Sequence, residues 1–373
     1  MKITAIEMYQ LDLPYARGVY KLSGGREYRS FDATFVRILT DRGLEGWGES
    51  TPFGANYMPA HAKGVRAGIE IIAPELLGMD PRLFDRVNER MDALLCGNNP
   101  VKAALDIACW DIFAKSVELP VCDLLGGSTG KPMPVMTSCY AGDPDDMRER
   151  IREYREQGFR GHSFKIGATE AEGGPALDAE RIKACLADRQ PGEFFLADCN
   201  SGLTPESTLR MLRLLPEGLD FTLEAPCPSW REMMSVRQRS NIPLIWDEQV
   251  ETDADIINLI ATDAGDGFGL KITKSGGLTR SRRHRDIGIA AGMTMAVQDT
   301  MGSPLSAATI AHMAQTIPEK FLRCLWDPRE ATTAEPFSID MPIVDATLSA
   351  PREPGLGATP NFSVLGTPLK IWS

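Results

Sequence analysis

The sequence predicts an α/β fold in which a parallel β/α barrel follows a small α+β domain. Three observations support this fold class. The first part of the chain alternates apolar and polar residues as strands do, the next part has helical spacing, and from residue 131 onward short apolar strands alternate with amphipathic helices. Alternating strands and helices form a parallel sheet, and about eight such units suggest closure into a barrel.

Residues 1–130 are expected to form the α+β domain. Residues 3–11 and 33–40 alternate in polarity, and Asp41-Arg-Gly43 supplies a turn between strands. From about residue 61 to 125 the apolar positions fall on one side of successive helices. An antiparallel sheet followed by a run of helices is typical of an α+β unit.

The barrel is assigned to residues 131–335, where the predicted strands recur at an even spacing. After residue 335 this rhythm is lost and the chain becomes rich in Pro and Gly. We therefore expect residues 336–373 to return to the first domain. The total of 373 residues suits one barrel with an additional domain.

Composition excludes several classes of protein. The formal net charge is −11 and no basic cluster dominates, which argues against nucleic acid and anionic membranes as partners. No apolar run approaches the length of a membrane span, and the first residues alternate in polarity instead of forming a signal peptide. Only four histidines are present, which disfavours His-rich zinc sites. We expect a cytoplasmic protein that acts on a small molecule as a homo-oligomer.

Five consecutive barrel strands are predicted to end in a charged residue. Each charge follows a mostly apolar run, so it belongs at the C-terminal end of its strand. In a barrel these ends meet at one mouth, where the loops build the active site. In chain order the five residues are Lys165, Asp198, Glu224, Asp247 and Lys271.

The residue types at these strand ends indicate a metal site with two bases. Asp198, Glu224 and Asp247 would repel one another unless a cation lay between them. Oxygen ligands favour Mg²⁺, with Mn²⁺ as a second choice, over Zn²⁺. A lysine beside this cation would have a lowered pKa and act as a base near neutral pH.

Such a site can remove the α-proton of a carboxylate substrate. The cation would bind the substrate carboxylate and stabilise the enediolate that forms. Lysines on both faces of the substrate permit epimerisation, whereas loss of a group from the β-carbon gives dehydration. The residues alone leave both outcomes open.

Several motifs in the sequence are similar to those of a known enzyme family. They are Gly46-Trp-Gly-Glu49, Ala104-Leu-Asp-Ile-Ala-Cys-Trp-Asp111, Leu124-Leu-Gly-Gly127, Asp198-x-Asn200, Glu224-x-Pro226, Asp247-Glu248, Lys271-x-x-x-Ser-Gly-Gly277 and Pro354-Gly-Leu-Gly357. With them the chain resembles the enolase superfamily, in its mandelate racemase/muconate lactonizing enzyme branch, over essentially its whole length. The resemblance implies a modified (β/α)7β TIM-type barrel under an N-terminal capping domain. It also implies Asp198, Glu224 and Asp247 as Mg²⁺ ligands, and Lys165 and Lys271 as opposed acid/base residues.

One difference from the usual pattern of this branch and two similarities indicate which of its members the chain resembles most. This branch usually has Lys-x-Lys on the second barrel strand, but here Ser163 stands in place of the first lysine. Ser163-x-Lys165 and Asp299-Thr-Met-Gly302 are similar to the members that act on proline derivatives. In those members an acid faces the substrate ammonium and an aromatic packs on its ring, which implies these roles for Asp299 and Trp326. The alternatives are a helix N-cap for Asp299 and core packing for Trp326.

Further candidates surround the predicted centre. Tyr57 is a candidate lid residue from the capping domain, or a loop tyrosine without ligand contact. Glu248 would support the metal or a lysine from behind, or form a structural ion pair. Asn200 and Ser163 are expected to support the same groups.

Three functions follow in order of preference. The first is Mg²⁺-dependent dehydration of cis-3-hydroxy-L-proline to a pyrroline carboxylate, which makes the protein a lyase. The second is a 2-epimerase, an isomerase acting on proline betaine, hydroxyproline betaine or a related amino acid derivative. The third is a non-catalytic scaffold, disfavoured because an idle site has no physical need for clustered acids.

Overall fold

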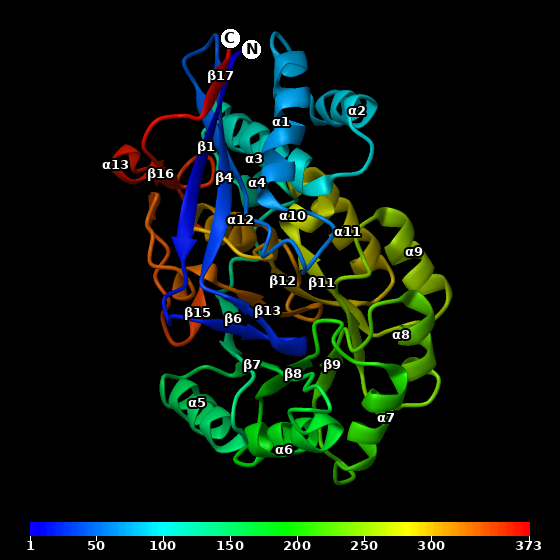
Figure 1. Cartoon of the computed structure of the whole chain (residues 1–373). Coiled ribbons are helices and arrows are strands. Elements are labelled where there is room, and N and C mark those ends of the chain that lie inside the picture. Colours follow the sequence, from blue (N-terminus) through cyan, green and yellow to red (C-terminus); the bar gives the residue numbers. More distant parts are fainter.

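Eight parallel strands close into a barrel in the computed structural model, which describes residues 1–373 (Figure 1). The ring closes because the last strand pairs with the first. Seven strand–helix units precede the final strand, so the expected (β/α)7β barrel is confirmed. The strands are β6 (Met133–Cys139), β7 (Gly161–Lys165), β8 (Phe194–Asp198), β9 (Thr222–Glu224), β10 (Leu244–Trp246), β11 (Gly267–Lys271), β12 (Thr294–Gln298) and β13 (Leu322–Trp326).

Helices cover the outside of the barrel, as the amphipathic segments predict. β7, β10 and β11 are buried at every position, because one face of each strand meets the barrel interior and the other meets the helices. The covering helices are α5 (Pro144–Glu156), α6 (Gly174–Leu186), α7 (Pro205–Arg213), α8 (Trp230–Arg237), α9 (Asp253–Ala261), α11 (Leu278–Ala290) and α12 (Pro304–Ala314).

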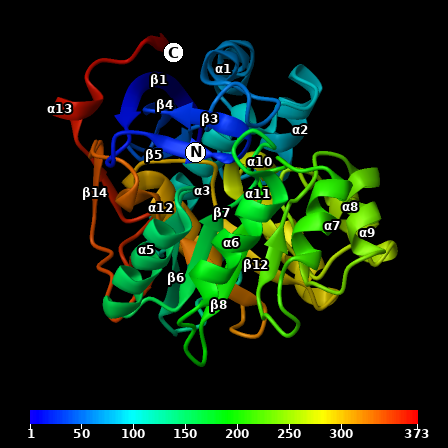
Figure 2. The ribbon, with the colours of Figure 1, turned by 60° about the horizontal axis from the view of Figure 1, so that its bottom comes forward.

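The capping domain consists of an antiparallel sheet and helices at one end of the molecule (Figure 2). Strands β1, β4 and β5 form consecutive antiparallel pairs. A separate buried apolar cluster lies between this sheet and helices α1, α2 and α3. The bounds are β1 (Ile3–Pro14), β4 (Ser30–Thr40), β5 (Glu45–Ser50), α1 (Ala62–Leu76), α2 (Phe84–Leu94) and α3 (Asn99–Ser116).

The C-terminal segment makes contact with both domains. Its last strand, β17 (Lys370–Trp372), pairs antiparallel with β1, and the marks for the two chain ends lie together in Figure 1. The earlier strand β15 (Thr347–Leu348) pairs instead with β6 of the barrel. The segment 336–373 therefore also extends the barrel sheet, which its composition did not predict.

A glycine allows close packing inside the capping domain, and the buried acid beside it joins this domain to the barrel. A Cβ atom at Gly48 would lie 1.9 Å from the carbonyl oxygen of Ala104, so only glycine lets β5 approach α3 this closely. The next residue, Glu49, is buried and accepts hydrogen bonds from the backbone N–H groups of Ser303 (2.9 Å) and Ser306 (3.2 Å). Its carboxylate thus accepts hydrogen bonds from the free backbone N–H groups at the N-terminus of α12, across the domain boundary.

No helix in the structure has the length and apolar character needed to cross a bilayer.

Candidate active site

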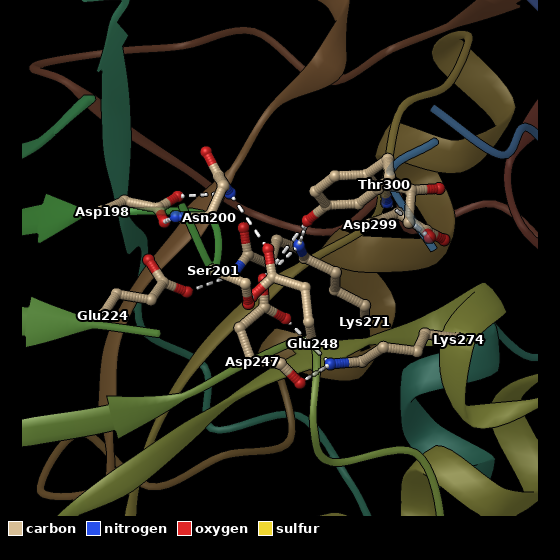
Figure 3. A network of polar contacts seen from close by, with 12 residues as sticks. Asp198, Asn200, Ser201, Glu224, Asp247, Glu248, Lys271, Lys274, Asp299 and Thr300 are labelled. Atoms are coloured by element: carbon tan, nitrogen blue, oxygen red, sulfur yellow. Dashed lines mark hydrogen bonds and ion pairs between the residues drawn. The ribbon is translucent and has the colours of Figure 1, made fainter. Parts of the chain in front are cut away.

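Strand register places three of the five charged residues side by side, and the other two stand at the ends of the next two strands. Lys165 on β7 lies beside Asp198 on β8, which lies beside Glu224 on β9. Asp247 directly follows β10, and Lys271 ends β11. All five side chains are buried, and the four that Figure 3 labels surround one space. The structure therefore brings together the cluster that the sequence predicted.

The two lysines approach this space from opposite sides of the barrel. β7 and β11 are separated by three strands in either direction around the ring. Lys165 forms an ion pair with Asp198, and Lys271 forms one with Asp247. These pairs place one ammonium group at each end of the row of carboxylates.

Glu224, in the middle of the row, has no cationic partner. Its one hydrogen bond comes from the side-chain amide of Gln298, at 3.3 Å. Burial and the nearby Asp198 and Asp247 carboxylates raise its pKa well above its ordinary value. A buried carboxylate in this position would gain stability from an additional positive charge.

The donor set suits Mg²⁺ by its chemistry. Its members are three buried carboxylates without nearby histidine or cysteine ligands, which is the hard-oxygen environment that Mg²⁺ prefers. In the arrangement described, no three acidic side chains stand close enough together to bind one cation. Asp198 and Asp247 bind lysines instead, so their carboxylates would have to turn toward Glu224 to share an ion.

The pKa of each catalytic-candidate lysine is raised in the arrangement described. Burial opposes the charged form of Lys165, but the negative charges of Asp198 and Glu224 outweigh it. For Lys271, Asp247 and Glu248 outweigh burial in the same way. The lowered pKa expected for a lysine beside a bound cation stays a prediction, because here the nearest charges are carboxylates of the protein.

Tyr57 reaches the centre from the capping domain. Its hydroxyl oxygen accepts a hydrogen bond from Lys271 Nζ at 2.5 Å and lies 3.4 Å from a carboxylate oxygen of Asp247. It therefore contacts catalytic-candidate residues and is not a free loop side chain. It lines a cavity of about 40 Å³ together with Tyr20, Leu22, Phe53, Met136, Ser138, Ser163, Lys165, Asn200, Lys271, Gln298, Asp299, Thr300 and Trp326.

Asp299 and Trp326 both line this cavity. The Asp299 carboxylate accepts hydrogen bonds from the backbone N–H groups of Thr273 (3.1 Å) and Thr300 (2.7 Å), and burial raises its pKa to about 6. It does not cap the following helix, because Ser303 caps α12, so the N-cap alternative is wrong. Trp326 is only 7% exposed, and its indole N–H has no hydrogen-bond partner.

Comparison with known families agrees with this geometry. The model described as "Enolase C-terminal domain-like" matches residues 146–364. The model of the mandelate racemase/muconate lactonizing enzyme N-terminal domain matches residues 27–126. The chain belongs to the mandelate racemase/muconate lactonizing enzyme family. It is an enzyme of the enolase superfamily, whose members bind Mg²⁺.

Individual relatives support the same assignment. The chain is 36% identical over the full length of both proteins to the cis-3-hydroxy-L-proline dehydratase of Roseibium aggregatum. It is 27% identical to the N-succinyl-L-Arg/Lys racemase of Bacillus cereus, over 84% of each chain. A crystal structure from Roseovarius nubinhibens, assigned to this family and complexed with magnesium, is 56% identical, with a TM-score of 0.98 and 100% of both chains covered.

In this family member one of the predicted supporting residues, Asn200, contacts Asp198 directly. The backbone and side-chain amides of Asn200 donate to the two Asp198 carboxylate oxygens at 2.8 and 3.1 Å. The same side chain donates to Glu248 at 3.2 Å, and Glu248 forms no ion pair, so the ion-pair alternative is wrong. Ser163 lies in the cavity wall on the same strand as Lys165.

Two polar residues at the centre were missed from the sequence. Lys274 Nζ donates to a carboxylate oxygen of Asp247 at 2.8 Å, from the short helix α10 (Ile272–Ser275). Gln298 ends β12 in register with Lys271 and donates to Glu224. The spacing Lys271-x-x-Lys274 is a signal for the first, whereas an uncharged strand end carries no comparable signal.

Proposed function

We propose that this enzyme removes the α-proton of a carboxylate substrate and dehydrates cis-3-hydroxy-L-proline to a pyrroline carboxylate. The observation that carries the proposal is the pair of lysines, Lys165 and Lys271, on opposite sides of one small cavity with three carboxylates between them. Opposed bases are what proton transfer at two positions of one bound substrate requires.

Asp198, Glu224 and Asp247 are the residues that would hold Mg²⁺, with Mn²⁺ as a possible substitute. When bound there, Mg²⁺ would offset the charge of these carboxylates, lower the lysine pKa values and stabilise the charge that develops on the substrate carboxylate. The protein side chains then carry out the proton transfers.

One lysine takes the α-proton through its neutral Nζ, and the other donates a proton to the departing 3-hydroxyl. The C–H and C–O bonds break, a carbon–carbon double bond forms, and water leaves. The resulting enamine tautomerises to the cyclic imine. The proton removed and the proton donated balance, so the reaction needs no oxidant or reductant.

A proline-type substrate is supported by three features of the site. The cavity is small, its acidic residue Asp299 suits a ring ammonium, and Trp326 offers an aromatic face. The full-length relative at 36% identity is a cis-3-hydroxy-L-proline dehydratase. We therefore assign the substrate class as cyclic amino acids, and we expect the enzyme to work in the cytoplasm as a homo-oligomer.

One observation favours a second candidate, a 2-epimerase of proline betaine or hydroxyproline betaine. Four aromatic residues line the cavity, namely Tyr20, Phe53, Tyr57 and Trp326. Aromatic faces bind quaternary ammonium groups, which cannot donate hydrogen bonds. In that reaction one lysine removes the α-proton and the other returns a proton to the opposite face.

Incubation with proline derivatives in D₂O distinguishes these functions. The purified enzyme with Mg²⁺ is given cis-3-hydroxy-L-proline or a proline betaine, and NMR follows the α-hydrogen and the products. Exchange with loss of water supports the lyase, and exchange with inversion alone supports the epimerase. If no α-hydrogen exchanges in any carboxylate offered, and EDTA lowers stability only, the scaffold alternative gains support and both catalytic proposals fail.

A further inference from the structure

Two loops of the capping domain close over the candidate active site. One is the hairpin of β2 (Tyr20–Leu22) and β3 (Arg26–Tyr28), and the other is the segment 53–57. Together they supply Tyr20, Leu22, Phe53 and Tyr57 to the cavity wall. The cavity of about 40 Å³ has room for about three water molecules, so these loops narrow the space in which a substrate would bind.

One side chain, Arg26, connects both loops to the barrel. Its Nη2 donates to the backbone oxygen of Asn200 at 2.9 Å, and its Nη1 donates to the backbone oxygen of Asn56 at 3.3 Å. Its Nε donates to the backbone oxygen of Ser23 at 2.9 Å. The guanidinium has no carboxylate partner within ion-pair distance, so its donors are used to join three separate chain segments.

The barrel surface is shaped to receive the hairpin. A Cβ atom at Gly167 would lie 2.7 Å from the Cβ of Ser23, and one at Gly202 would lie 2.9 Å from the same atom. The backbone N–H of Gly24 also donates to the Gly167 oxygen at 3.2 Å. The tip of the hairpin therefore packs against two barrel glycines, and a side chain at either glycine would prevent this contact.

The barrel residue that receives Arg26 also supports the acidic centre. Asn200 donates two hydrogen bonds to Asp198, and its backbone φ of 42° lies in the left-handed region that few non-glycine residues adopt. Its carbonyl direction is thus fixed by the same turn that orients Asp198. Arg26 therefore donates to a carbonyl group that belongs to the same turn as the amides that orient Asp198.

We propose that Arg26 is the latch that closes both capping loops over the substrate as one unit. It is a positioning residue, because it acts through Asn56 and Asn200 and does not line the cavity. The inference rests on the proposed function in one respect only, because the cavity that the two loops cover is the one that we assign to the substrate.

The first test measures loop opening without any substrate. Hydrogen–deuterium exchange of the Mg²⁺-supplemented enzyme is compared for wild type, Arg26→Ala, Arg26→Lys and the control Arg29→Ala. Arg29 directly follows the hairpin, is exposed and makes no side-chain hydrogen bond, so its loss should change nothing. Loss of charged hydrogen bonds should speed exchange by about 10- to 100-fold in Arg26→Ala, in the 20–28 hairpin and in segment 53–57 together.

The second test measures catalysis on whichever substrate is turned over. Arg26→Ala should lower kcat/KM by about 10- to 100-fold while leaving the Mg²⁺ dissociation constant unchanged, and Arg26→Lys should lie between it and wild type. Unchanged exchange in segment 53–57 of Arg26→Ala, or of Arg26→Lys if the alanine variant does not fold, overturns the latch. If no substrate is found, the proposed function fails while the exchange measurement still decides the latch.

Discussion

Tyr57 of the capping domain and Lys271 of the barrel meet through a hydrogen bond of 2.5 Å from Lys271 Nζ to the phenol oxygen. The same ammonium lies 5.1 Å from the centre of the Tyr57 ring. Burial and the nearby acids, Glu248 first among them, raise the pKa of Tyr57 well above its ordinary value, so its hydroxyl stays protonated. The orientation of a proposed catalytic lysine therefore depends on a residue that arrives only when the capping loop is in place.

Replacing Tyr57 with phenylalanine tests this dependence. The change keeps the ring that packs against Phe53 and removes only the oxygen that binds Lys271. Loss of a hydrogen bond to a charged group should lower kcat by about tenfold, with Mg²⁺ affinity unchanged. Steady-state kinetics and calorimetric Mg²⁺ titration measure both. The matched control is Tyr9→Phe, a buried tyrosine of the capping domain bonded to Glu7, which should retain wild-type kcat.

The three carboxylates are each expected to be essential for metal binding. Asp198→Asn, Glu224→Gln and Asp247→Asn each remove one charge and one ligand oxygen, so Mg²⁺ binding should weaken and turnover should vanish. Calorimetric titration with Mg²⁺ alone measures the first effect. Glu193→Gln is the control, because this buried acid pairs with Arg155 at the other end of β8. Wild-type activity in a variant without added metal would contradict the assignment.

The two lysines should be unequal in proton exchange although both are needed for turnover. General acid–base residues contribute about 10²–10⁴-fold, so Lys165→Ala and Lys271→Ala should each lose at least that much activity. One variant should still exchange the substrate α-hydrogen in D₂O, because removing the acid leaves the base in place. NMR of the recovered substrate measures this exchange. Wild-type exchange rates in both variants would exclude the two-lysine mechanism.

Asp299 is expected to recognise the positive end of a zwitterionic substrate. Asp299→Asn should raise KM for an amino acid, since loss of a buried charge pair costs about 2–5 kcal/mol of binding. An uncharged hydroxy acid gains nothing from this carboxylate, so its KM should not rise. Kinetics with both substrate types decide the matter. Equal losses for both would contradict this role and leave Asp299 with a structural role toward Thr273.

Glu49 predicts a specific pH dependence of stability. Burial raises the pKa of this carboxyl from 4.5 to about 7, against the hydrogen bonds that it accepts from Ser303 and Thr51. A raised acid pKa means that the folded state binds more protons than the unfolded state between pH 4.5 and 7, so this contribution to stability falls as pH rises. Relative to Glu49→Gln, wild type should lose roughly 3 kcal/mol across that window. Chemical unfolding at pH 5 and pH 8 tests it, and a pH-independent difference would contradict it.

The sequence was sufficient to predict the fold and the charged centre. Parallel strands have their C-terminal ends at one mouth, so a charge at the end of each apolar run fixes its location without long-range information. Lys165, Asp198 and Glu224 followed from this rule, and the register of β7, β8 and β9 places them side by side.

Contacts between distant segments could not be predicted in the same way. Lys274 lies on a short helix after its strand, and Arg26 meets Asn200 only because the capping domain is folded onto the barrel. The direction of the lysine pKa shifts also required the structure. It depends on which acidic side chains lie beside each ammonium, and residue types alone do not determine that.

The pairing of β1 with β17 has a consequence for biosynthesis. β1 precedes the barrel in the chain and β17 follows it, so the edge of the capping sheet that β17 covers stays open while the barrel is being made. An open strand edge is a template for pairing with other chains. We therefore expect nascent chains to be able to pair through β1 until β17 is made, and a change that removes β17 would expose this edge while leaving every proposed catalytic residue intact.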